Sequence, residues 1–357
     1  MKKWGRNVVV GSIVSCLFVL TACGSSGNSG ANGSSTPASS QTAGTKNIQS
    51  RVMKAGIVSP KGHPQALGLD KFAEIVEKNS GGKMKIQKFN DGTLGDDKKM
   101  MEALQGGLQE IAVITTPPVF GTIKEFGIFD FPLVFKNEKE ADAVMDGPIG
   151  KKLLDKLPAH NLVGLAYWEN GFRSITNSKH PIQKADDLKG LKIRTLPNQI
   201  HLEAFKTWGS NPTPMVFAEV FAALESKAID GQENSLAVIE SHKLYEVQKY
   251  LSITNHLYAP FVFLVSKKYW DQLSDEEKKI IQDAVAESTK FQRETNRSMA
   301  KKTLENLKSK GMHVNEMPAE EVAKMQEVTK PLIDKFSKDV GEDLVKELFS
   351  ELEKLRK

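Results

Sequence analysis

Two arginines, Arg173 and Arg194, are placed where a guanidinium group could bind a carboxylate. Each lies in a short, strand-like segment that follows a turn signal, Asn-Gly at 170–171 and Lys-Gly at 189–190. An arginine is always charged, and its planar fork of donors matches the two oxygens of a carboxylate. On a rigid strand near a loop it is a good receptor for an acid, although an arginine on the polar face of a strand is more often a solvated surface charge.

The elements around these arginines follow from hydrophobic periodicity. In LKIRT at 191–195, alternation predicts a strand with Leu191 and Ile193 on one face and Lys192 and Arg194 on the other. Upstream, strand and helix patterns alternate at 51–59, 65–79, 83–89, 97–105 and 111–114, which predicts a parallel α/β layer. Ligands bind outside the carboxyl ends of such strands. Thr115 and Thr116 are therefore either residues of a pocket edge or caps of a turn.

Later patterns predict strands at 162–169 and 260–266 and helices at 139–157, 199–208, 217–226 and 236–246. Ser274 and Glu277 form a capping box, and neither proline nor glycine interrupts the chain from there until Gly311. A helix of about 36 residues would be roughly 54 Å long, more than one small domain needs. We therefore expect it to run across two lobes; the alternative is a break near 295–298 and two shorter helices.

The first 46 residues have the pattern of a targeting segment and a tether. Basic residues at 2, 3 and 6 precede an apolar run at 8–20, and the run ends in Leu-Thr-Ala-Cys, the lipobox pattern of bacterial lipoproteins. We expect residues 1–22 to be a lipoprotein signal peptide, cleaved before a lipidated Cys23. The alternative is an ordinary signal peptide followed by a chance cysteine. The glycine- and serine-rich stretch 23–46 is expected to be a disordered linker.

Composition argues against several classes of function. The second cysteine, Cys16, leaves with the signal, so the mature chain has no thiol for a disulfide, metal cluster or nucleophile. Without the three basic residues of the signal, the net charge of +5 falls to about +2. This near balance does not suggest the basic surface that a nucleic-acid-binding protein needs. The seven histidines form no i, i+4 pair, and Walker, GxSxG, HExxH and GxGxxG motifs are missing. We expect no metal, no cofactor and no enzyme; the pair Glu169 and Glu233 is weak evidence for catalysis.

Several short sequence motifs, in their order and spacing, resemble those of the DctP family of solute-binding proteins of tripartite ATP-independent periplasmic (TRAP) transporters. The similarity covers nearly everything from about residue 51 to the C-terminus. The words include GTLGDD at 92–97, FDFPLVF at 129–135, GFR at 171–173, TNS at 176–178, DLKGLKIR at 187–194, PTPM at 212–215, EVFAAL at 219–224, DGQEN at 230–234 and LYEVQKYLSITNH at 244–256. Three residues depart from those usual in the family: Glu225, Lys227 and Ser235. The conformation of the local turn is therefore left open, whereas the assignment of the two arginines is not affected.

The resemblance implies roles for individual residues. Arg194 would be the principal carboxylate anchor through a bidentate salt bridge, Arg173 a second contact, and Asn234 an amide donor to the carboxylate. Phe217 stands where the family places an apolar wall, although by itself a phenylalanine there would more often be core. Three further candidates, at positions that vary with the ligand, are His63, Thr116 and Asn198.

The sequence thus predicts an α/β, two-lobed periplasmic-binding-protein (Venus flytrap) fold with hinge strands and a long helix shared by both lobes. The expected lobes are 47–170 with about 260–298, and 171–259 with about 299–357. The expected function is capture of a small organic acid outside the cell and delivery to TRAP membrane subunits. The protein would be a monomer, lipid-anchored to the outer face of the membrane of a Gram-positive-type cell. The alternatives are a binding lipoprotein of an ABC importer or sensor kinase, and a lipid-anchored hydrolase.

Overall fold

The computed structural model describes residues 47–357 of the chain. The predicted signal peptide, the lipidation of Cys23 and the linker to residue 46 lie outside the described residues. Among the described residues, no helix combines the length and the apolar character that a membrane span requires.

The first third of the described chain alternates strand and helix as the sequence predicts. Strand β1 pairs in parallel with both β2 and β3, which confirms the parallel layer. The helices α1 and α2 begin at polar caps: Asp96, for example, accepts a hydrogen bond from the backbone N–H of Lys99 at the start of α2. The elements are β1 (Arg51–Gly56), α1 (Pro64–Asn79), β2 (Met84–Phe89), α2 (Asp97–Gly106), β3 (Ile111–Thr115) and the short α3 (Pro117–Phe120).

Two long antiparallel strands form the middle of the sheet, β4 (Leu162–Asn177) and β8 (Tyr250–Ser266). The sequence predicted β4 as two strand segments divided at 170–171, because Asn-Gly has the composition of a turn, and it predicted only the 260–266 part of β8. In the structure Gly171 has φ +95° and the register of the pair shifts between 169 and 171, so the signal marks a bulge inside a continuous strand. A second positive φ, +44° at Asn255, interrupts β8.

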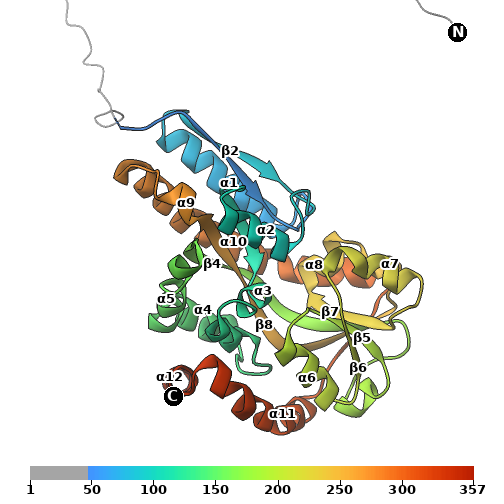
Figure 1. Cartoon of the computed structure of the whole chain (residues 1–357). Coiled ribbons are helices and arrows are strands. Elements are labelled where there is room, and N and C mark those ends of the chain that lie inside the picture. Colours follow the sequence, from blue (N-terminus) through green and yellow to red (C-terminus); the bar gives the residue numbers. More distant parts are fainter. Residues whose placement is uncertain (1–46) are drawn as a thin grey trace, which may run out of the picture. The chain divides into compact units, whose positions relative to one another are not determined.

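One sheet contains all the strands of residues 47–357, in the order β2-β1-β3-β8-β4-β7-β5-β6, with β9 paired to β8 (Figure 1). Arg194 pairs in register with Thr213 of β6 and with Gln232 of β7. The strands beyond β4 are β5 (Lys192–Thr195), β6 (Asn211–Pro214), β7 (Gly231–Ser235) and β9 (His313–Glu316). The helices between them are α6 (Gln199–Thr207), α7 (Val220–Glu225) and α8 (Leu236–Ser241).

Two predicted helices are wrong in extent. The helix expected at 139–157 is divided into α4 (Glu138–Asp146) and α5 (Pro148–Leu154), because Pro148 cannot donate a backbone hydrogen bond and starts a new helix. The helix expected at 236–246 ends with α8 at Ser241. Lys243 has φ +54°, a conformation that a continuing helix excludes, and only a 3-10 turn at Leu244–Glu246 follows.

The long helix is continuous, α10 (Asp275–Ser309), with 35 residues and the predicted capping box between Ser274 and Glu277. The alternative break near 295–298 does not occur. This helix packs against α1, β4 and α8, so it contacts elements on both sides of the β4–β8 pair. The other helices are α9 (Lys267–Trp270), α11 (Ala319–Val340) and α12 (Glu342–Leu355).

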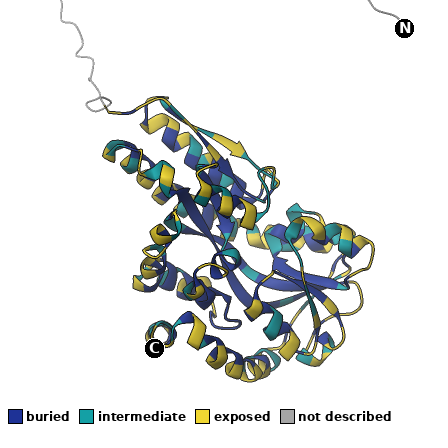
Figure 2. Cartoon of the chain, in the orientation of Figure 1, coloured by how far each residue is buried: buried dark blue, intermediate teal, exposed yellow. Residues whose placement is uncertain are grey.

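The hydrophobic residues gather in three clusters. One joins β1, α1, β8 and α10 through residues such as Phe72, Phe263 and Ile281, and a smaller one joins α7, β8 and the end of α10 through Val220, Leu251 and Leu307. The third and largest runs along the segment 119–135 to α11 and α12. Figure 2 shows the central strands buried and the outer faces of the helices exposed. The sheet is therefore a rigid frame for residues at the ends of its strands.

Candidate functional site

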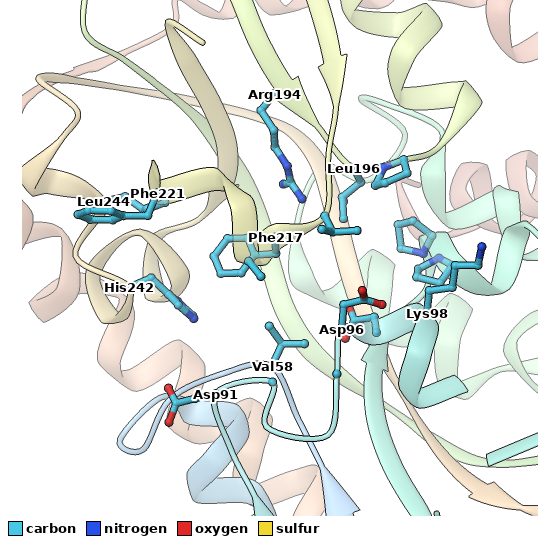
Figure 3. A pocket seen from close by; sticks show the side chains of 18 residues that line it. Val58, Asp91, Asp96, Lys98, Arg194, Leu196, Phe217, Phe221, His242 and Leu244 are labelled. Carbon is cyan, nitrogen blue, oxygen red and sulfur yellow. The ribbon is translucent and has the colours of Figure 1, made fainter. Parts of the chain in front are cut away.

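A cavity of about 380 Å³ lies where segments that follow β1 and β2 meet segments that follow β5 and β6 (Figure 3). Its volume falls within the range of roughly 300–1,000 Å³ for small-molecule sites. A smaller cavity of about 50 Å³ adjoins it, shares Arg194 and Phe217, and adds Arg173 and Asn234. The side chains that characterise the larger cavity are Val58, Asp91, Asp96, Asp97, Lys98, Arg194, Leu196, Phe217, Phe221 and His242.

Arg194 is completely buried, yet part of its guanidinium group is free. Nε and Nη2 donate to one acceptor, the Met215 carbonyl oxygen, at 3.0 and 2.8 Å. Nη1 is buried without a hydrogen-bond partner at the cavity wall. Burial lowers the pKa of Arg194 to about 10, against the attraction of Glu233, so the group is still charged at neutral pH. Alternation predicted Lys192 and Arg194 on one polar face; Lys192 is exposed, but Arg194 is buried and lines the cavity.

Arg173 is equally buried, but each of its three guanidinium nitrogens donates to a protein acceptor. It forms an ion pair with Glu233, whose Oε1 accepts from Nη2 at 2.7 Å, and Nη2 also donates to the Glu233 carbonyl oxygen at 2.7 Å. Nη1 donates to Asn234 Oδ1 at 3.0 Å. The register of β4 with β7 produces these contacts, because Arg173 pairs opposite Ser235 and Ser174 opposite Asn234. Asn234 reaches the smaller cavity with its acceptor already used by Arg173.

The carboxylate of Glu233 is held ionised in the interior. Burial alone would raise its pKa, but the charge of Arg173 and a hydrogen bond from its guanidinium group outweigh burial and hold the pKa well below its usual range. His256 Nε2 lies 3.3 Å from Glu233 Oε2, and burial lowers the pKa of His256, so this imidazole is neutral at pH 7. Glu169, which with Glu233 was only weak evidence for catalysis, accepts hydrogen bonds from Arg297 and Tyr258.

The side of the cavity away from Arg194 is acidic, because Asp91, Asp96 and Asp97 line the cavity. Asp97, the first residue of α2, accepts from the backbone N–H and the hydroxyl of Thr115 with Oδ2, at 3.3 and 2.5 Å. Burial raises the pKa of Asp97 to about 6, against the hydrogen bonds from Thr115 and the charge of Arg194.

An aromatic group separates the two walls. The ring centroid of Phe217 lies 5.7 Å from Arg194 Cζ, and the ring of His242 stands almost perpendicular to Phe217 with centroids 4.6 Å apart. Figure 3 shows the Arg194 side chain directed toward Phe217, with His242 and Asp91 on one side and Asp96 and Lys98 on the other. Phe217 is half-buried and lines the cavity, while it also packs against the cluster around Val220.

Three predicted residues do not line either cavity. Asn198 is the N-cap of α6, where Oδ1 accepts from Ile200 and Nδ2 donates to Asp130 at 2.8 Å. His63 caps α1, with Nδ1 accepting from the backbone of Gln65. Thr116 is buried at the start of α3, and Thr115 lines the smaller cavity in its place. Successive side chains along a strand point to opposite faces, so the side chain of Thr115 faces the smaller cavity and that of Thr116, the next residue, does not.

Sequence reasoning missed Asp97, His242 and Val58 as cavity residues. The sequence could have indicated Asp97, since it is the last residue of the motif GTLGDD and the first residue of a helix at the carboxyl edge of the sheet. His242 and Val58 had no such signal, because they are distant in the sequence and only the folded chain brings both to the cavity. Among residues 47–357, no group of three or more histidine, cysteine, aspartate or glutamate side chains is placed to hold a metal ion.

Comparison with known proteins connects this geometry to a family. Residues 55–339 match DctP, described as bacterial extracellular solute-binding protein, family 7. The 2,3-diketo-L-gulonate-binding periplasmic protein YiaO of Escherichia coli K12 is 33% identical, over 85% of this chain and 92% of that protein.

Two solved structures share the fold. The sugar acid binding protein DctPAm of Advenella mimigardefordensis, in complex with galactonate, has a TM-score of 0.85 at 46% identity and covers 86% of this chain and 99% of its own. A TRAP periplasmic solute-binding protein of Polaromonas, bound to D-erythronate, has a TM-score of 0.80 at 38% identity, with 83% and 97% covered. The two-lobed α/β fold predicted from the sequence is confirmed, and the chain belongs to the DctP family of bacterial extracellular solute-binding proteins.

Proposed function

We propose that this protein captures a small organic acid through Arg194 and delivers it to TRAP membrane subunits for uptake driven by an ion gradient. One observation carries the proposal: a buried, charged guanidinium group at the wall of a 380 Å³ cavity has a nitrogen, Nη1, without a hydrogen-bond partner. A buried donor left unpaired costs about 1–3 kcal/mol. A ligand carboxylate would pair with it and balance the buried charge.

The surroundings of Arg194 strengthen such a bond. Leu196, Phe217 and Phe221 make much of the wall apolar, so water is excluded once the ligand is bound and the effective dielectric constant is low. The fixed bonds from Nε and Nη2 to the Met215 carbonyl hold the group in one orientation. The ligand therefore meets a preorganised receptor and does not have to order the side chain.

The relatives support an acid as the ligand. Galactonate, D-erythronate and 2,3-diketo-L-gulonate, which three of them bind, differ in length and oxidation state but share a carboxylate. A receptor group common to these proteins would recognise that carboxylate, and other cavity residues would select the rest of the molecule.

The direct test is calorimetry with Arg194→Ala and a panel of organic acids that includes these ligands. We expect binding to fall by at least about a hundredfold, because a buried charge pair is lost, while the fold is kept. Arg356→Ala is the matched control: Arg356 pairs with Glu140 far along the chain and lines neither cavity. Near-normal affinity of Arg194→Ala for the acid would refute the assignment.

The mode of delivery is a separate part of the proposal. Uptake in vesicles that contain a small and a large permease subunit should require this protein and an ion gradient. Uptake that requires ATP would favour the alternative of an ABC importer, and signalling without uptake would favour a sensor kinase. Turnover of an acid by the purified protein would favour the hydrolase, whereas we expect the acid to be recovered unchanged.

We further propose that the mature protein is a monomer anchored through a diacylglycerol on Cys23, outside a Gram-positive-type membrane. The support is the lipobox pattern and the tether-like stretch that follows it. Mass spectrometry of the mature N-terminus tests the modification, and Cys23→Ser should release the protein into the medium. Light scattering of the released protein tests the monomer.

The lobes, 47–170 with about 260–298 and 171–259 with about 299–357, are proposed to close over the ligand. The bulges of β4 and the positive φ at Asn255 of β8 supply irregular backbone where hinge strands must bend. Small-angle scattering should show a smaller radius of gyration when the acid is present. An unchanged radius at saturation would argue against closure.

A further inference from the structure

One histidine connects the two proposed lobes beside the cavity. His242 directly follows α8 in the second lobe, and it lines both cavities together with Val58, which follows β1 in the first lobe. The His242 ring forms a hydrogen bond with the backbone carbonyl of Val58. Figure 3 shows the His242 side chain directed toward Val58 and Asp91. This contact therefore joins segments that must separate when the lobes open.

The neutral form of the His242 ring is sufficient for its contacts. Nδ1 lies 3.3 Å from the Val238 carbonyl oxygen and 3.2 Å from Ser241 Oγ, which leaves Nε2 for Val58. A neutral imidazole donates with one ring nitrogen and accepts with the other. Nε2 can therefore donate to the Val58 carbonyl while Nδ1 accepts from the Ser241 hydroxyl. The perpendicular contact with Phe217 fixes the plane of the ring.

The surroundings oppose a second proton on this ring. The charge of Asp91 and the carbonyls of Val238 and Val58 favour the protonated form, but burial outweighs them and lowers the pKa of His242 below its ordinary 6.5. His63 of the first lobe is buried at the N-cap of α1 and interacts electrostatically with His242. Burial and this interaction lower the pKa of His63 to about 3, so His63 is neutral as well.

The other charged groups near His242 are engaged elsewhere or belong to the cavities. On its own segment, Glu240 accepts a hydrogen bond from Asn306 of α10 at 2.7 Å. The charged side chains that share a cavity with His242 are Asp91, Asp96, Asp97, Lys98, Arg173 and Arg194.

We infer that His242 is a proton-sensitive latch between the lobes: the neutral ring holds the closed state, and its protonation in the open state weakens ligand capture in acid. The inference rests on the proposed function in one respect, since it takes closure over an acid as given. It does not depend on which residue anchors that acid.

The sign of the effect follows from exposure of the ring. Opening returns the His242 ring to water, where its pKa rises toward 6.5, so in acid the open state takes up a proton that the closed state excludes. Affinity for the ligand therefore falls as the pH falls below 6.5, by at most about tenfold per pH unit for one proton.

Asp97 acts in the opposite direction and has to be separated from the latch. Burial raises the pKa of Asp97 to about 6, so the closed cavity favours its protonated form and acid strengthens binding. A variant at His242 removes only the contribution of the latch, and the Asp97 contribution stays the same in both proteins.

Calorimetry at pH 7.5 and 5.5 tests the latch, with whichever of D-galactonate and D-erythronate the wild type binds more tightly. In His242→Gln, the amide can donate to the Val58 carbonyl but does not titrate. The ratio of the Kd at pH 5.5 to the Kd at pH 7.5 should be about fivefold to tenfold smaller in this variant than in the wild type. His180→Gln, which changes an exposed histidine outside both cavities, should keep the wild-type ratio.

NMR titration of the His242 ring gives a readout that a merely structural role would not change. We expect the pKa of His242 to be lower at a saturating concentration of the acid than without it. An equal pKa in both conditions, or the same Kd ratio in His242→Gln and the wild type, would overturn the latch.

The outcomes also separate the latch from the proposed anchor. Binding that survives Arg194→Ala, together with a ratio that depends on His242, would overturn the anchor and support the latch. Loss of binding in Arg194→Ala, together with an unchanged ratio in His242→Gln, would support the anchor and overturn the latch.

Discussion

Arg173 and Arg194 lie at the same site, are equally buried and come from neighbouring parts of one sheet, yet they are used differently. Every guanidinium nitrogen of Arg173 bonds to Glu233 or Asn234, so Arg173 holds β4 against β7. Arg194 has only a backbone carbonyl as partner and keeps Nη1 free. Residue type and burial therefore do not identify a receptor; what identifies it is bonding capacity that the protein itself leaves unused.

The largest effect expected from this difference is on stability at Arg173. Arg173→Met leaves Glu233 buried without its partner, which should lower the free energy of unfolding by about 3–5 kcal/mol. The loss should shrink toward pH 4. In the wild type, the lowered pKa of Glu233 gives stability that is present above its ordinary pKa of 4.5 and lost below it, whereas in the variant an unpaired Glu233 can protonate.

Urea unfolding of Arg173→Met at pH 7.5 and pH 4.5 measures both effects. The double variant Arg173→Met/Glu233→Leu removes both charges and should recover part of the loss. A single variant as stable as the wild type would mean that the pair is not a structural clamp.

Asp97→Asn should stabilise the ligand-free protein at neutral pH. The pKa of Asp97 is raised from its ordinary 3.8 to about 6, so between these values the folded state holds more protons than the unfolded state and stability falls as the pH rises. Above pH 6 the full cost is present, about 1–2 kcal/mol once partial exposure is allowed for. The gain should be measurable by urea unfolding at pH 7.5 and nearly absent at pH 4; an equal gain at both would contradict a charge effect.

Arg194→Met should not lower the stability of the protein as Arg173→Met does. Burial lowers the pKa of Arg194, so the charged group opposes folding, and no partner carboxylate is left unpaired when it is removed. We expect the free energy of unfolding to change by less than about 1 kcal/mol or to increase. Thermal unfolding beside Arg173→Met checks this prediction. Equal destabilisation by both variants would remove the distinction between them.

The smallest effect is expected at Phe217. Phe217→Leu keeps an apolar wall but loses the aromatic face 5.7 Å from Arg194 Cζ, so affinity for the acid should fall by about 0.5–1 kcal/mol. Phe291→Leu, an exposed phenylalanine on α10, is the control. A loss as large as that of Arg194→Ala would mean that Phe217, and not the guanidinium group, dominates binding.

Much of the fold could be predicted because local signals agreed with tertiary structure. The capping box at Ser274 and the uninterrupted periodicity after it predicted α10, and strand–helix alternation predicted the layer from β1 to β3. The errors occurred where a local signal has two meanings. Asn170-Gly171 has the composition of a turn but forms a bulge, since the partner strand β8 continues the ladder on both sides.

The same division applies to the site. The sequence alone determined residue chemistry and spacing: two arginines after turn signals, a phenylalanine after PTPM, and the words that place the chain in its family. Only the tertiary structure decided that Glu233 occupies Arg173, that Arg194 stays available, and that Asp97 faces the same cavity while Asn198 and His63 cap helices. The reason is that hydrogen-bond capacity is shared among groups distant in sequence, and which of them remains unpaired depends on how the strands and helices pack.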